Sequence, residues 1–192
     1  MFTGEKPLGN KDLIVEFGSG NGQTLLNLAN RNVEQDLHFI GIELDLSLFQ
    51  KSCSILTKDN DNITFVNDDF EDVIITFHDE SIAMFLSILP HPNYIGKESE
   101  VRWKRFYELM LNKMKRYGQF LLVTEYTNEL LSVVTVEEYK KWRKWIILTF
   151  ETIGFKIYAV ADHPPPRFLS HYLSRFSNDA DRIKILTLLM GK

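Results

Sequence analysis

Three glycines at alternate positions, Gly18, Gly20 and Gly22, follow an apolar run that begins at Leu13 and has Glu16 as its only charged residue. Because glycine carries no Cβ, such a turn lets the backbone approach a ligand closely. A buried strand that breaks into this turn and continues as the helix-like stretch TLLNLANR is typical of the first unit of nucleotide-binding α/β proteins. The pattern predicts a ligand-binding turn, in which the carboxylate of Glu16 can meet a positive charge or a hydroxyl of the ligand.

Further carboxylates stand where the next two apolar segments end. Glu43 lies 21 positions after Gly22, close to the spacing of about 20 residues at which nucleotide-binding folds place a carboxylate on ribose hydroxyls. Asp68 and Asp69 follow the third segment; either one could accept from an adenine amino group with Phe70 beside the ring, and the sequence leaves open which. The GxGxG spacing, with an acid two residues before it, resembles the first motif of class I S-adenosylmethionine-dependent methyltransferases. This cofactor has no phosphates, and carboxylates suit its hydroxyls, amino groups and sulfonium charge.

The fourth apolar segment, residues 81–89, ends in the sequence LPHPN. Two prolines around His91 fix the backbone at the end of a central strand, where two reactants would have to be held in line. We therefore expect His91 to stand at the reaction centre. The alternative interpretation is a plain proline turn with a solvated histidine.

Apolar strands alternate with helix-like segments along the chain. Strands are expected at residues 13–17, 37–43, 63–66, 81–89, 119–124, 155–160 and 183–189. Helices are expected at residues 23–31, 46–58, 99–116 and 136–152, the third of them capped by Gly118. Continuous apolar strands are typical of a parallel sheet covered on both faces. The chain is predicted to be α/β, with an open, mostly parallel seven-stranded Rossmann-like sheet, residues 1–192 as one domain, and the site at the carboxyl ends of the strands.

Composition is ordinary for a globular protein, with 44% hydrophobic and 25% charged residues. The single cysteine, Cys53, cannot form an internal disulfide, and no Cys and His residues have zinc-ligand spacing, so no metal is expected. No apolar run reaches about 18 residues and the first residues are polar, so we expect a cytoplasmic protein with no membrane segment. The net charge of −4 gives no general attraction to nucleic acid, which would require a local basic face.

The chain resembles the bacterial-type tRNA (guanine-N7)-methyltransferases, which share a class I methyltransferase sheet. The resemblance rests on the stretches VEFGSGNG, FIGIE, LPHPN, VTEY and SHYLSRF, whose order and spacing agree over nearly the whole chain. Within the last stretch, Ser170, Tyr172, Arg175 and Phe176 are in register with the family's Thr-x-Tyr-Glu-x-Lys/Arg-Phe signature.

The resemblance assigns roles to individual positions. It implies S-adenosylmethionine as cofactor, contacted by Glu16, Glu43 and Asp69, a tRNA substrate contacted by Glu125, Ser170 and Tyr172, and a reaction centre at position 91. Together with the residue patterns, this gives three expected sets. The cofactor-binding residues are Glu16, Gly18, Ser19, Gly20, Gly22, Glu43, Asp68, Asp69 and Phe70; the catalytic residues are His91 and Glu125; and the substrate-binding residues are Asn93, Tyr94, Arg105, Ser170, Tyr172 and Arg175.

The catalytic motif departs from the family at three positions. His91 stands where the family has aspartate, Asn93 where it has tryptophan, and Leu173 where the signature has glutamate. Guanine N7 attacks with a lone pair and loses no proton, so the enzyme must align the reactants and tolerate positive charge on the purine. We expect Glu125 to offset that charge and His91 to position the base. Two alternatives stay open: a methyltransferase with a different acceptor (another RNA base, a protein or a small molecule), and a catalytically silent protein that binds cofactor or RNA.

Basic residues form two groups on expected helices and are candidates for tRNA binding. The first contains Lys97, Arg102, Lys104, Arg105, Lys113, Lys115 and Arg116, and the second contains Lys140, Lys141, Arg143 and Lys144. Trp103 and Tyr94 are placed where they could stack on an exposed base. The alternative is a solvated helix face. The expected assembly is a monomer or homodimer, with a partner subunit as a further option.

Overall fold

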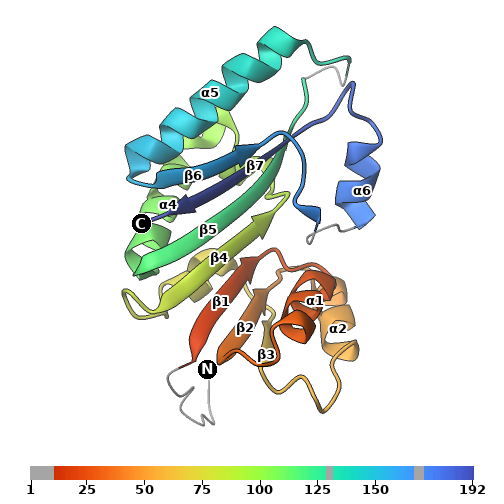
Figure 1. Cartoon of the computed structure of the whole chain (residues 1–192), viewed down its shortest axis with the longest axis vertical. Coiled ribbons are helices and arrows are strands. Elements are labelled where there is room, and N and C mark those ends of the chain that lie inside the picture. Colours follow the sequence, from red (N-terminus) through yellow and green to blue (C-terminus); the bar gives the residue numbers. More distant parts are fainter. Residues whose placement is uncertain (1–10, 129–131, 167–170) are drawn as a thin grey trace.

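The structure is a computed structural model that describes residues 11–128, 132–166 and 171–192. A seven-stranded sheet with the order β3-β2-β1-β4-β5-β7-β6 runs through the molecule (Figure 1). Five strands are parallel to one another, and β7 runs antiparallel to both of its neighbours, β5 and β6. The predicted open, mostly parallel seven-stranded sheet is therefore confirmed.

The elements follow the alternation that the apolar segments indicated, with four short helices that the sequence pattern did not reveal: α3, η1, η2 and α6. The strands are β1 (Asp12–Phe17), β2 (Leu37–Ile42), β3 (Ile63–Val66), β4 (Ile82–Ile88), β5 (Met114–Tyr126), β6 (Lys156–Ala161) and β7 (Lys184–Gly191). The helices are α1 (Gln23–Arg31), α2 (Leu46–Ser54), α3 (Phe70–Ile74), η1 (Pro92–Tyr94), η2 (Lys97–Ser99), α4 (Glu100–Lys113), α5 (Val136–Ile153) and α6 (His171–Ser177).

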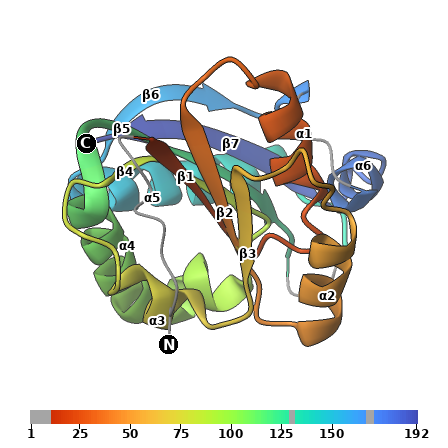
Figure 2. The ribbon, with the colours of Figure 1, turned by 90° about the horizontal axis from the view of Figure 1, so that it is seen from below.

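Helices cover both faces of the sheet, and each face has its own apolar cluster (Figure 2). On one face, α3, α4 and α5 bury large aromatic side chains such as Trp103, Tyr107 and Phe150. On the other, α1 and α6 bury Leu25 and Leu173 against β1, β4 and β5. Burial on both faces explains why the central strands read as continuous apolar runs. Among the described residues, no helix is long and apolar enough to cross a membrane.

The third predicted helix was wrong at its carboxyl end. The structure ends α4 at Lys113, because Met114 turns to an extended backbone and is buried beside Ile82 of β4. Lys115 and Arg116 therefore belong to β5, and Gly118 lies in the stretch where β5 bulges out of register with β4 and caps no helix.

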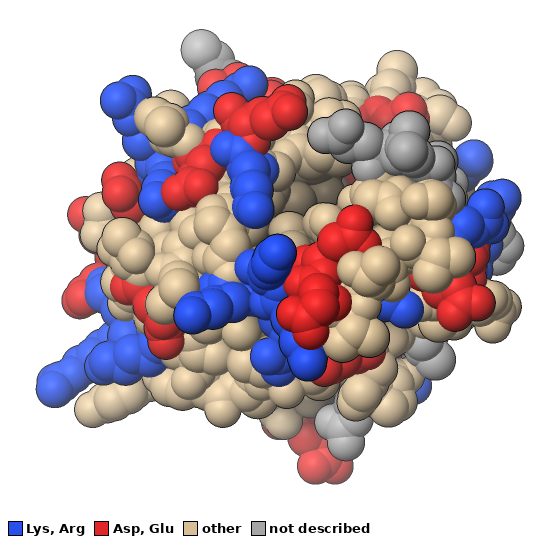
Figure 3. Space-filling model, turned by 90° about the horizontal axis from the view of Figure 1, so that it is seen from above, with Lys and Arg blue, Asp and Glu red and all other residues tan. Residues whose placement is uncertain are grey.

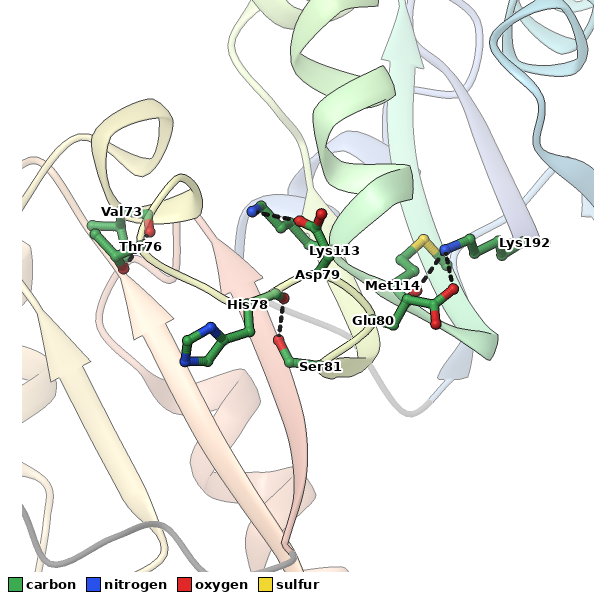
Figure 4. Close-up of polar contacts among 9 residues, drawn as sticks. All are labelled: Val73, Thr76, His78, Asp79, Glu80, Ser81, Lys113, Met114 and Lys192. Atoms are coloured by element: carbon green, nitrogen blue, oxygen red, sulfur yellow. Dashed lines mark hydrogen bonds and ion pairs between the residues drawn. The ribbon is translucent and has the colours of Figure 1, made fainter.

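Ion pairs stabilise the turn that precedes β4, at the amino end of the sheet (Figure 4). Asp79 pairs with Lys113 at the end of α4, and Glu80, whose φ is 55°, pairs with Lys192. Lys192 also donates to the main-chain oxygen of Met114 at 3.1 Å. These contacts connect the start of β4 to α4 and to the residue that follows β7.

Candidate active site

The glycine turn connects β1 to α1 with three left-handed residues: Gly18, Gly20 and Gly22 have φ of 67°, 57° and 77°. A Cβ on Gly22 would lie 2.4 Å from Cζ of Phe65, so this glycine is required by packing between α1 and β3. A Cβ on Gly18 or Gly20 would meet nothing within 4 Å. The first two glycines thus leave open space beside the backbone, as a bound ligand would require.

Glu43 is fixed at the end of β2 by two main-chain N–H groups. The N–H of Gly20 donates to its Oε2 at 2.7 Å, and the N–H of Asp45 donates to its Oε1 at 2.9 Å. Asp45 in turn caps α2 by accepting from the N–H of Leu48. The carboxylate therefore holds the glycine turn and the start of α2 in a fixed relation.

Glu16 and Ser19 are buried beneath the turn with polar atoms that lack a partner. Within the described residues, Oε2 of Glu16 and Oγ of Ser19 make no hydrogen bond, although both side chains are almost completely excluded from solvent. Burial raises the pKa of Glu16 well above its ordinary value, and the nearby charge of Glu43 raises it further. An unpaired buried carboxyl is costly in the free protein, so it is suited to a cation that binds there.

A cavity of about 670 Å³ opens at the carboxyl ends of β1, β2 and β4. Seven of the residues selected from the sequence line it: Gly18, Glu43, Asp69, Phe70, His91, Asn93 and Tyr94. Residues that the sequence analysis did not select complete the wall: Phe17, Ile42, Leu44, Asp45, Ser87, Ile88, Leu89, Pro90, Phe106 and Tyr107. The volume falls in the range of about 300 to 1,000 Å³ that is usual for small-molecule sites.

Aromatic rings form one wall of this cavity. Phe70 lies 4.5 Å from Tyr94, 5.0 Å from Phe106 and 5.2 Å from Phe17 between ring centroids. The hydroxyl of Tyr94 donates to Oε1 of Glu71 at 2.7 Å, so the orientation of its ring is fixed. Burial, followed by the hydrogen bond to Glu71, raises the pKa of Tyr94. A planar ring system fits such a wall.

The two aspartates after β3 differ in what they contact. Asp69 lines the cavity and caps α3, because its Oδ1 accepts from the N–H of Glu71 at 2.8 Å. Asp68 is exposed, and its Oδ1 accepts only the adjacent N–H of Asp69 among the bonds of the described residues. Asp69 is therefore the better placed of the two to meet a ligand.

The turn after β4 presents His91 at the mouth of the cavity. Leu89 adopts a left-handed conformation, with φ of 55°, while its N–H donates to the main-chain oxygen of Val123 at 2.7 Å. Nδ1 of His91 then accepts from the N–H of Asn93 at 3.2 Å and caps the short helix η1. A left-handed leucine is energetically unfavourable, and such residues concentrate at functional sites.

Glu125 lies at the end of β5, outside the lining of this cavity. Its Oε2 and Oγ1 of the neighbouring Thr124 have no hydrogen-bond partner among the described residues. Burial raises the pKa of Glu125 above its ordinary value. The structure therefore does not place Glu125 beside His91 on the cavity wall.

The remaining predicted substrate residues fall into three places. Arg105 lines a separate cavity of about 620 Å³ on the outer side of α4, with Glu71 and Arg102. Arg175 is exposed on α6. Ser170 and the side chain of Tyr172 lie outside the described residues.

One expectation from the sequence requires correction. Trp103 is fully buried and donates from Nε1 to the main-chain oxygen of Gly96 at 2.7 Å, so it cannot stack on a base. Leu173, which replaces the glutamate of the signature, packs in the apolar cluster under α6. In the part of the chain that the structure covers, no three His, Cys, Asp or Glu side chains gather as metal ligands would.

Comparison with known proteins gives one family and several structural neighbours. A family model described as "Putative methyltransferase" matches residues 10–151. A tRNA (guanine-N(7)-)-methyltransferase of Oceanobacillus iheyensis is 30% identical over 119 residues, which cover 60% of this chain and 55% of the relative. The match thus spans about half the length of that relative.

Solved structures resemble the whole chain at lower identity. An S-adenosylmethionine dependent methyltransferase from Mesorhizobium loti has a TM-score of 0.63 at 14% identity, covering 98% of this chain and 94% of that one. Phosphoethanolamine N-methyltransferase 2 of Haemonchus contortus, solved in complex with S-adenosyl-L-methionine, has a TM-score of 0.63 at 16% identity, covering 97% and 50%. These similarities show the fold of class I methyltransferases.

Proposed function

Because the chain belongs to the methyltransferase family whose model covers residues 10–151, we propose that it transfers a methyl group from S-adenosylmethionine to N7 of a guanine in tRNA. The O. iheyensis relative carries that activity in its name and supports the choice of acceptor. The proposal treats residues 1–192 as one catalytic domain that acts in the cytoplasm, where its tRNA substrate is found.

The cavity at the strand ends is the observation that carries the proposal. It joins Gly18, Glu43 and Asp69 from three separate loops with an aromatic wall. The donor set fits S-adenosylmethionine: Glu43 could accept from the ribose hydroxyls and Asp69 from the adenine amino group, with Phe70 against the ring. Glu16 and Gly20 are not among the residues that line this cavity but lie close in the chain to Phe17 and Gly18, which do. The unpaired carboxyl of Glu16 and the open space beside Gly20 would suit the amino acid portion of the cofactor there.

The bound cofactor would supply the methyl group, and the chain itself would position the acceptor. Guanine N7 needs no base, so the rigid turn that carries His91 and Asn93 has to hold the purine in line. His91 would act as a hydrogen-bonding group in this role, and its Nδ1 already accepts from the N–H of Asn93. As positive charge develops on the purine, it would favour the ionised form of Glu125, whose pKa burial has raised.

Methylation of bulk tRNA tests the activity. Purified protein, labelled S-adenosylmethionine and tRNA from a strain that lacks the protein should yield labelled 7-methylguanosine on digestion and mass spectrometry. Calorimetry should show heat when S-adenosylhomocysteine is titrated into the protein. Absence of both signals would remove the enzymatic assignment.

Two variants test the division of roles between the catalytic residues. Glu125→Gln should lower kcat by roughly tenfold or more, as expected for a lost electrostatic contribution of about 1.4 kcal/mol. His91→Ala should mainly raise KM, because it removes a positioning contact. Loss of turnover with His91→Ala, together with normal turnover of Glu125→Gln, would contradict this assignment.

A second candidate function keeps the cofactor and changes the acceptor. The observation that favours it is the burial of Leu173 where the signature glutamate would be, together with His91 in place of aspartate. If the acceptor is another RNA base, the mass spectrum would show a methylated nucleoside other than 7-methylguanosine. If the acceptor is a protein or a small molecule, the labelled methyl group would be found there instead.

A further inference from the structure

A groove between α4 and α5 lies outside the cavity described above. It has a volume of about 430 Å³ and is lined by Glu100, Lys104, Lys141, Lys144, Trp145, Leu148, Thr149 and Thr152. We call it the α4–α5 groove. Lys104 from the first basic group therefore lines the same surface as Lys141 and Lys144 from the second, although Lys104 and Lys141 are 37 positions apart along the chain.

The only carboxylate in the lining of the groove is occupied by neighbouring groups. Glu100 pairs with Lys104 at 2.5 Å and accepts from Nε1 of Trp145 at 3.0 Å. The hydrogen bond from Lys104 lowers the pKa of Glu100. Its charge is thus compensated within the groove.

Three lysines on or beside the groove are not held in ion pairs. Lys97, Lys141 and Lys144 are exposed and form no ion pair with any residue that the structure describes. In the first turn of α5, Glu137 pairs with Lys140, and Glu138 closes the capping box with Thr135 while the charge of Lys141 helps to lower its pKa. Within the lining of the groove, three lysines and one carboxylate leave an excess of two positive charges, in a chain whose net charge is −4.

Lys97 lies beside the groove and follows closely in the chain on the segment that lines the active-site cavity. Lys97 lies in η2, four residues after Asn93 of the cavity wall, and its Nζ lies 5.2 Å from the centroid of the Trp145 ring. Seen from above, Lys and Arg side chains lie mostly in the left and central parts of the molecule, interspersed with Asp and Glu (Figure 3). A polyanion whose base enters the cavity would therefore meet Lys97 first and the lysines of the groove beyond it.

We propose that the α4–α5 groove binds the phosphate backbone of the RNA whose guanine enters the cavity. This inference rests on the proposed function, because it takes RNA as the acceptor. Lysine ammonium groups act as point charges that bind phosphates without reading the base sequence. The groove would thus supply affinity and register, and the cavity would supply base selection.

The double variant Lys141→Gln/Lys144→Gln tests the groove. Binding of unmodified tRNA should weaken roughly tenfold or more at about 0.15 M salt, and the slope of log K against log[salt] should fall by about two, since each lysine that contacts a phosphate contributes about one. The matched control is Lys51→Gln/Lys58→Gln, which removes two exposed lysines in α2 and in the loop after it, outside both basic groups and outside the lining of the groove. The control should retain both the affinity and the slope of the unaltered protein.

Titration with S-adenosylhomocysteine separates this inference from the proposed function. The groove variant should bind S-adenosylhomocysteine normally, since none of the altered lysines lines the cavity.

Three outcomes distinguish the two proposals. If tRNA is methylated but the groove variant keeps the full salt slope, the groove inference is overturned and the proposed function stands. The lysines would then face another partner, such as an acidic protein. If tRNA binding depends on the groove but no tRNA is methylated, the inference is supported and the proposed reaction falls. If unaltered protein binds no tRNA, both are overturned.

Discussion

The main-chain N–H of Gly20 donates to Oε2 of Glu43 at 2.7 Å, and this bond joins the turn after β1 to the end of β2. The two residues are 23 positions apart and belong to different βα units. Glu43 therefore has a structural role before any ligand arrives, because it orders the loop beside which the cofactor would bind. The structural role of Glu43 and its proposed role in cofactor binding can be tested by measuring the stability of a variant and its affinity for the ligand separately.

Glu43→Ala should lower both the stability and the affinity for S-adenosylhomocysteine. The free energy of unfolding in urea should fall by about 1 to 2 kcal/mol, because the N–H groups of Gly20 and Asp45 lose their acceptor. Affinity by calorimetry should fall by roughly tenfold or more, corresponding to about 1.4 kcal/mol. Glu34→Gln, at an exposed position between α1 and β2, should change neither quantity. Full ligand affinity in Glu43→Ala would exclude Glu43 as a cofactor residue.

Substitutions of the glycines should have unequal effects on stability. Gly22→Ala places a methyl group 2.4 Å from the ring of Phe65, and residue 22 has a left-handed backbone conformation. The steric clash and the backbone strain together should lower the free energy of unfolding by about 2 to 5 kcal/mol. Gly20→Ala meets nothing within 4 Å and should cost only the backbone strain of about 1 to 2 kcal/mol. Urea unfolding of both variants gives the comparison. Equal losses would show that Phe65 moves away from the new methyl group.

The buried carboxyl of Glu16 should make stability depend on pH. Its folded pKa is raised above the ordinary value of 4.5, so between these values the unfolded chain has lost the proton that the folded protein retains. The free energy of unfolding therefore falls as pH rises through this window, and the loss is complete above the raised pKa.

Glu16→Gln should remove this contribution. Relative to the unaltered protein, the variant should become more stable as pH is raised from about 5 to about 8 in urea titrations. It should also bind S-adenosylhomocysteine more weakly, since the cation of the ligand loses its counter-charge. A constant stability difference across the range would mean that Glu16 titrates normally in the folded state.

His91→Asp should be tolerated by the fold and should speed methylation. Nδ1 of His91 caps η1 by accepting from Asn93, and an aspartate at this position can form the same kind of cap. A carboxylate would also offset the charge that grows on the purine; a gain of about 1 kcal/mol corresponds to roughly a fivefold rise in kcat. Slower methylation by His91→Asp than by His91→Ala would show that an anion is unfavourable at this position.

The parts of the fold that follow from local chemistry could be predicted from the sequence. The central strands are buried on both faces, so their apolar runs, such as residues 81–89, mark them clearly. The end of α4 could not be predicted in this way. Lys115 and Arg116 are compatible with a helix, and it is the burial of Met114 beside Ile82 that makes the segment a strand.

The same distinction applies to the candidate site. Glu43 and Asp69 could be found because each follows a strand directly, and parallel strands bring their carboxyl ends to one edge. The aromatic wall could be found only in part: Phe70 and Tyr94 were selected, but Phe17 and Phe106 join Phe70 only when three elements pack together. Trp103 was misassigned for this reason as well: its neighbours in the sequence are charged, but its own side chain faces the sheet.

The antiparallel strand β7 lies between β5 and β6, although both are made before it. During synthesis, β6 therefore has no neighbour to pair with until residues 184–191 are available, and the open edge of β5 is exposed to other chains for the same interval. We expect this half of the sheet to close last, so a nascent chain arrested before residue 184 would be prone to aggregate.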